Sequence, residues 1–104
     1  MGRRDLLTDD EVAAALDSLP GWTLVDGKLH AEFVFTDFAA AFAFMTAVAP
    51  VAEELDHHPA WTNVWNTVTV DLWTHDRGGL TSLDVDLARR MSALAAPAGP
   101  PTSD

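Results

Sequence analysis

The chain has 104 residues, which is enough for one compact domain with a single hydrophobic core. Its formal net charge is −10, and only 6 residues are Lys or Arg. Direct binding to nucleic acid or to anionic lipid needs clustered positive charge, so this composition argues against both. The chain has no cysteine, which excludes disulfides, zinc–thiolate sites and thiol nucleophiles.

The N-terminal sequence lacks the apolar core of a signal peptide. The most apolar stretch, residues 39–52, contains Pro50 and is too short to span a bilayer. We therefore expect a soluble, cytoplasmic protein with no membrane contact. The expected organisation is a flexible N-terminus at residues 1–7, a single domain at residues 8–95 and a disordered tail at residues 96–104.

The first predicted element is a helix that begins after Thr8. Thr8 can cap this helix, and Glu11, three residues later, can complete a capping box. Two strands are predicted next, at residues 22–25 and 28–35. They flank Asp26-Gly27, a dipeptide typical of tight hairpin turns.

A long second helix is predicted to begin after Thr36-Asp37 and to end near His57. It carries two apolar stripes, whereas a surface helix needs only one. The first stripe contains Phe38, Phe42, Met45, Ala49 and Ala52, and the second contains Phe44, Val48, Val51 and Leu55. We expect burial on both sides, against the sheet and against another subunit. Pro50 should kink or break the helix near Ala47.

Residues 61–74 alternate in the way that is typical of strands, and two strands with a corner near Asn66-Thr67 are the favoured interpretation. One predicted face contains Val64, Val68, Val70 and Leu72, and the other contains Trp61, Trp65, Thr67, Thr69, Asp71 and Trp73. A glycine-containing loop follows. Thr81 then caps a third helix, with Asp84 at the capping-box position.

The resulting order is α-β-β-α-β-β-α. Because the strands come in hairpin pairs, the sheet should be antiparallel, with the helices on one face. The predicted fold class is therefore α+β, with a four-stranded antiparallel sheet and three helices on one face of it.

Three histidines are candidates for chemistry: His57, His58 and His75. Pro59 biases His58 away from helical geometry, so the two adjacent imidazoles should point in different directions. His75 falls where the last strand enters the loop, a place where side chains often face ligands. Imidazoles can serve as acids or bases near neutral pH. Taken singly, His57 or His58 is equally well explained as a helix cap, and His75 is more often a surface residue.

The main alternative to acid–base chemistry is that these histidines bind zinc. Metal-binding pairs on helices prefer a spacing of four residues, and adjacent histidines cannot easily face one ion. No serine stands in a nucleophile-elbow motif either. From the residues alone, the sequence indicates a small α+β domain with histidine acid–base chemistry as an open possibility.

Two ordered motifs sharpen this interpretation. The first comprises Glu53, His57, His58, Pro59, Trp61, Asn63, Val64, Asn66 and Val68; the second comprises Thr74, His75, Gly78, Gly79, Leu80, Thr81, Asp84, Leu87 and Ala88. Together they closely resemble the signature of the pterin-4a-carbinolamine dehydratases. The similarity extends over nearly the whole chain except the two tails. Two departures stand out: Trp65 replaces the usual Tyr, and Pro50 interrupts the central helix.

The resemblance implies a reaction, the removal of water from a 4a-hydroxytetrahydropterin to give the quinonoid dihydropterin. It implies no metal, redox cofactor or covalent intermediate. His57 and His75 are the expected proton donors to the C4a hydroxyl, each suited to one stereoisomer, and His58 is the expected anchor and base toward N5; the roles of His57 and His58 could be exchanged. The expected substrate-binding residues are Glu53, Asp56, Pro59, Trp61, Thr74 and Asp84.

The resemblance also implies partners. Family members form dimers through sheet edges and can form tetramers through their long helices, for which the stripe of Phe44, Val48 and Leu55 is suited. Pro50 favours the dimer. A functional link to an aromatic amino acid hydroxylase is expected, because such enzymes produce the carbinolamine. The alternative function is a non-catalytic, protein-binding or dimerisation scaffold, a role that some family members have.

Overall fold

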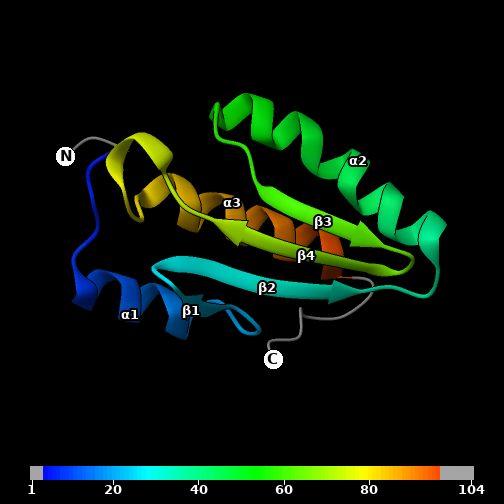
Figure 1. The fold of residues 1–104 in the computed structure, drawn as a ribbon, viewed down its shortest axis with the longest axis horizontal. Coiled ribbons are helices and arrows are strands. Elements are labelled where there is room, and N and C mark those ends of the chain that lie inside the picture. The colour runs from blue at the N-terminus through cyan, green and yellow to red at the C-terminus, as the bar shows by residue number, and fades with distance from the viewer. Residues whose placement is uncertain (1–3, 97–104) are drawn as a thin grey trace.

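The computed structural model describes residues 4–96. Within them, the elements follow the predicted order, which confirms the α+β class (Figure 1). They are α1 (Asp9–Asp17), β1 (Thr23–Val25), β2 (Lys28–Val34), α2 (Phe38–Leu55), β3 (Ala60–Val64), β4 (Thr67–Leu72), the 3-10 turn η1 (His75–Arg77) and α3 (Ser82–Ala95). All strand pairs are antiparallel, and the strand order is β1-β2-β4-β3.

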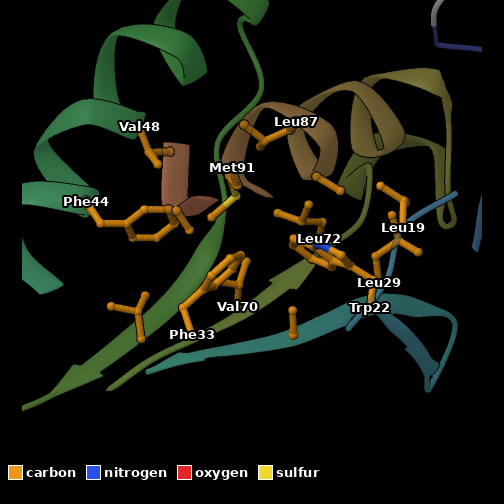
Figure 2. Packing of buried hydrophobic residues seen from close by; sticks show 14 of the residues in the cluster. Leu19, Trp22, Leu29, Phe33, Phe44, Val48, Val70, Leu72, Leu87 and Met91 are labelled. Atoms are coloured by element: carbon orange, nitrogen blue, oxygen red, sulfur yellow. The ribbon is translucent and has the colours of Figure 1, made fainter. Parts of the chain in front are cut away.

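The side chains on one face of the sheet are part of the hydrophobic core. Leu29 pairs with Leu72, Ala31 with Val70 and Phe33 with Val68, and all six side chains are buried. Figure 2 shows strand residues such as Phe33 pointing toward Phe44 and Val48 of α2 and toward Leu87 and Met91 of α3. The opposite face is polar near its centre, where the His30 Nδ1 and Asp71 Oδ1 atoms lie 2.9 Å apart. α2 and α3 therefore cover one face of the sheet, as predicted for these two helices.

The predicted turn and cap residues are confirmed. Asp26 and Gly27 both have positive φ, as the tight hairpin turn requires. Thr8 and Glu11 form the predicted capping box of α1. Thr81 and Asp84 form a second capping box at the start of α3. Local sequence signals thus determine where these elements begin and turn.

The β3–β4 hairpin turns at Trp65 and Asn66, so the prediction of two strands is confirmed. The Asn63 side-chain amide donates to the carbonyl oxygens of Trp65 and Thr67, which ties the turn together. The Asn66 amide donates to the Phe35 carbonyl, which ties the turn to the end of β2.

The predicted face assignments of Val64 and Trp61 are wrong. Trp61 pairs with Val70 and therefore lies on the helix-covered face, where it packs against the core. Val64 pairs with Thr67, lies on the open face and is 76% exposed. The physical reason is the two-residue turn between the strands. The side chains before and after this turn alternate between the two faces separately, whereas the prediction continued a single alternation through the turn.

The break expected at Pro50 does not occur. α2 runs without interruption from Phe38 to Leu55, with Pro50 on its exposed side. Proline leaves the carbonyl of Thr46 without its helical N–H donor. Val48 and Val51, on either side of Pro50, are buried in the core, and this tertiary packing outweighs the local cost.

The prediction of which stripe faces outward also needs correction. Phe44 and Val48, expected to suit contact with another subunit, are buried within the chain and pack on the sheet and α3. The large apolar residues exposed on α2 are Phe38 and Phe42, which belong to the other stripe. Phe44 and Val48 lie toward α3, which packs closely against α2 and fixes this orientation.

α2 is long and apolar enough to cross a bilayer by length and composition alone. Its inner side, however, is part of the protein core. A core helix of a folded domain passes the same test, so the length and composition of α2 are weak evidence for a membrane span.

Residues 4–7, expected to be flexible, lie against the loop between β4 and α3. The Leu7 N–H donates to the Leu80 carbonyl, and a Cβ atom added at Gly79 would lie 3.1 Å from Leu6. Of the predicted tail at residues 96–104, all but Ala96 lies outside the described residues.

Candidate active site

The end of α2 separates the two adjacent histidines. Asp56 takes the left-handed conformation, with φ of 50°, and the His57 N–H returns to the Ala52 carbonyl. This ending turns the chain sharply, as a left-handed residue after a helix commonly does. His57 is buried and His58 is exposed, so the predicted divergence of the two side chains is confirmed.

His57 is held by the buried carboxylate of Asp84. The His57 Nε2 and Asp84 Oδ1 atoms lie 2.5 Å apart, and Asp84 is fully buried. The other oxygen, Oδ2, accepts hydrogen bonds from the Thr74 hydroxyl and the Thr81 N–H. Because an ionised carboxylate only accepts, the shared proton of the pair is assigned to Nε2, and Nδ1 is the ring nitrogen left for other partners.

Asp84 therefore has two structural roles. It completes the capping box at the start of α3, and it orients the imidazole at the end of α2. The Thr74 and Thr81 hydroxyls lie 2.8 Å apart and extend the same buried network to the residue before His75. The network thus joins the two segments that carry His57 and His75.

His58 has a separate carboxylate partner. Its Nε2 lies 2.6 Å from Oε2 of Glu53, which is in the last turn of α2. The side chains are 56% and 76% exposed, so water reaches this pair, unlike the His57–Asp84 pair.

His75 begins the η1 turn, at the same end of the molecule as the junction of α2 and β3 (Figure 1). The turn is closed by a bridge between Thr74 and Gly79 and by Gly78, whose φ is 69°. The imidazole is exposed and lies against the indole of Trp73, with ring centroids 4.1 Å apart. Nζ of Lys28 lies 4.1 Å from the centroid of the Trp73 ring.

The three histidines line one cleft of about 360 Å³. Its wall comprises Arg4, Asp56, His57, His58, Pro59, Ala60, Trp73, His75 and Asp76. Two apolar depressions of about 390 and 410 Å³ lie elsewhere, but neither is lined by a histidine. The chemistry of the lining therefore identifies the histidine cleft as the candidate active site.

At the rim of the cleft, Arg4 and Asp76 form an ion pair. The hydrogen bond from Arg4 lowers the pKa of the Asp76 carboxyl below its ordinary value of 3.8, and the nearby positive charges act in the same direction. The charge of Asp76 is thereby compensated beside His75.

The predicted site residues differ in whether they line the cleft, lie beside it or are buried behind it. Asp56 and Pro59 line the cleft beside the histidines. Glu53 does not line the cleft but binds His58, which does. Thr74 and Asp84 are buried behind the lining residues. Trp61 is not in the cleft lining. It borders an adjacent depression of about 200 Å³ that shares Ala60 with the cleft.

Sequence reasoning did not assign Trp73, Arg4 or Asp76 to the site. Trp73 could have been found, because it directly precedes Thr74 and His75 at the end of a strand. Arg4 could not, because 72 positions separate it from its partner Asp76. Within residues 4–96, no three His, Asp or Glu side chains are grouped so as to hold a metal ion.

Residues 5–94 match the family described as pterin 4 alpha carbinolamine dehydratase. A relative from Rhizorhabdus wittichii is 56% identical over 91 residues, covering 86% of this chain and 94% of the relative. One from Solibacter usitatus is 51% identical over 90 residues, covering 86% of this chain and 95% of the relative. Both carry provisional names as pterin-4-alpha-carbinolamine dehydratases.

A solved structure is also similar. The crystal structure of a transcriptional coactivator/pterin dehydratase from Brucella melitensis superposes with a TM-score of 0.85 at 47% identity. The match covers 88% of this chain and 100% of that one.

Proposed function

Because the chain belongs to the pterin-4-alpha-carbinolamine dehydratase family, we propose that it dehydrates a 4a-hydroxytetrahydropterin to the quinonoid dihydropterin. In this reaction the C4a–O bond breaks as the leaving hydroxyl receives a proton and departs as water. A base removes the proton from N5, and the N5 electron pair forms the new C4a–N5 double bond. The step needs one acid and one base and is balanced without a metal or redox cofactor.

The observation that carries the proposal is the convergence of His57, His58 and His75 on one cleft. They come from the end of α2 and from η1, with β3 and β4 between them in the chain, so their meeting is a property of the fold. Each histidine has its own support, which is Asp84 for His57, Glu53 for His58 and Trp73 for His75.

The proposed roles follow from these supports. His57 donates Nε2–H to Asp84 and presents Nδ1 to the cleft; in the imidazolium form Nδ1 carries the second proton, which passes to the leaving hydroxyl. His75, on the opposite segment, is the second proton donor, so that either hydroxyl stereoisomer can be served. His58, paired with exposed Glu53, anchors the substrate and takes the N5 proton. Asp56 and Pro59 contact the pterin, and Trp61 serves as a further apolar wall next to the cleft.

In the cell, this activity would regenerate pterin after an aromatic amino acid hydroxylase has used it. We place the protein in the cytoplasm, as a homodimer or homotetramer that needs no metal or cofactor. Its net charge of −10 does not favour nucleic acid as a partner.

The second candidate function is protein binding. The name of the Brucella melitensis structure includes a transcriptional coactivator, and Phe38 and Phe42 are exposed on α2 here. In that case the cleft would be dispensable and the α2 surface would carry the function.

The test is stopped-flow dehydration of freshly generated 4a-hydroxytetrahydropterin. We expect the wild-type chain to accelerate the reaction well beyond the spontaneous rate. His58→Ala should remove most of that acceleration while leaving the fold intact, because His58 is exposed. The matched control is His30→Ala, which removes a histidine paired with Asp71 on the open face of the sheet. No acceleration by the wild type would favour the protein-binding function.

A further inference from the structure

The histidines of the cleft differ in how they are held. His57 and His58 each meet a carboxylate, Asp84 and Glu53 respectively. The imidazole of His75 contacts an aromatic ring instead, that of Trp73, with the ring planes inclined at 41°. This ring contact holds the His75 side chain.

The indole of Trp73 is itself well fixed. It packs against the hydrophobic core, directly after the last residue of β4. Lys28, at the start of β2, places its ammonium group near the same ring. The next residue, Thr74, is buried and bonded to Asp84. A rigid strand end therefore carries Trp73, whereas His75 stands on an exposed turn.

We propose that Trp73 is the positioning residue of His75: its indole holds the imidazole in the orientation from which His75 delivers a proton to the substrate. This inference rests on the proposed function. An aromatic ring suits the task because it packs against the imidazole without accepting the proton that the acid must deliver. A carboxylate in the same place would accept a hydrogen bond from the ring and occupy one of its nitrogens.

The rival role for Trp73 is a substrate wall, since it also lines the cleft. The two roles differ in kinetics. A wall that binds substrate and transition state equally changes KM, whereas a residue that positions the acid changes kcat. They also differ in their dependence on His75, because a positioning residue acts only when the acid is present.

The experiment is a double-mutant cycle of Trp73→Leu and His75→Gln, followed by stopped-flow kinetics. We expect Trp73→Leu to lower kcat by about threefold to tenfold with KM nearly unchanged. In the His75→Gln background, the same substitution should cause no further loss. Trp73→Phe, which keeps an aromatic face, should retain most of the activity. Trp65→Leu, the same exchange at the exposed hairpin turn, is the matched control.

A structural readout accompanies the kinetics. The NMR signals of the His75 ring protons should be displaced by the ring current of Trp73, and Trp73→Leu should abolish that displacement. A rise in KM without a fall in kcat, or equal losses in both backgrounds, would overturn the inference and leave the proposed function standing. If His75→Gln itself retained full activity, the role of His75 as a proton donor would fail, and the inference with it.

Discussion

At the scale of single residues, the Asp84 carboxylate links three parts of the site. It binds His57, accepts from Thr74 beside His75, and caps α3 through the Thr81 N–H. Asparagine at this position has the same shape but presents an N–H₂ group on one side. Either the His57 bond or the bonds to Thr74 and Thr81 must then be rearranged.

We therefore expect Asp84→Asn to reduce both stability and activity. The free energy of unfolding should fall by about 1–3 kcal/mol, since a buried bond to a charged group is lost. The kcat should fall by about tenfold to a hundredfold, because positioned acid–base groups contribute about 10²–10⁴-fold. Denaturant titration and stopped-flow kinetics measure the two effects. Asp86→Asn removes the same charge from α3 and should change neither by much; equal losses in both variants would contradict the role of Asp84.

The Arg4–Asp76 pair gives a prediction about acid pH. The pKa of Asp76 is lower in the folded chain than its ordinary value of 3.8, chiefly because Arg4 donates a hydrogen bond to the carboxylate. The stabilisation is therefore present above the unfolded pKa and is lost as the pH falls through the folded pKa. In Arg4→Gln, an NMR titration should find the pKa of Asp76 raised toward 3.8. Arg89→Gln, which removes an arginine on α3, should leave the titration of Asp76 unchanged.

At the scale of elements, the starts and turns were predictable because each depends on residues close in sequence. The capping boxes at Thr8 and Thr81 and the Asp26-Gly27 turn are examples. The face of Trp61 was not predictable, because it depends on the register set by a two-residue turn. Likewise, the three histidines could be chosen from sequence and Trp73 could have been added from its place beside His75, but Arg4 reaches the cleft through tertiary packing.

The uninterrupted α2 leads to a prediction about Pro50. Alanine there would restore an N–H donor to the Thr46 carbonyl and remove the clash of the proline ring with the preceding turn. We expect Pro50→Ala to raise the free energy of unfolding by about 1–3 kcal/mol, measured by denaturant titration. Pro20→Ala makes the same exchange after α1, outside any helix, and should bring no gain. A Pro50→Ala protein no more stable than Pro20→Ala would mean that the helix bears no local cost at this position.

At the scale of the whole molecule, two kinds of surface are open to association. The β3 strand is an outer edge of the sheet, with one side unpaired in the strand order β1-β2-β4-β3. Such edges readily pair with a second copy. On α2, Phe38 and Phe42 are 50% and 56% exposed, with ring centroids 5.9 Å apart. Because Pro50 does not interrupt α2, the helix surface remains available for a second contact.

This arrangement predicts that edge pairing and helix packing can be separated. If α2 joins two dimers, Phe42→Asp places a charge in the helix contact and should halve the mass measured by light scattering, leaving dimers. The sheet edge is untouched by this change, so the dimers should persist. Ala14→Asp adds the same charge to the exposed side of α1 and should leave the mass unaltered. A Phe42→Asp protein with the wild-type mass would show that association does not involve this part of α2. Its activity would show whether this surface of α2 affects the cleft.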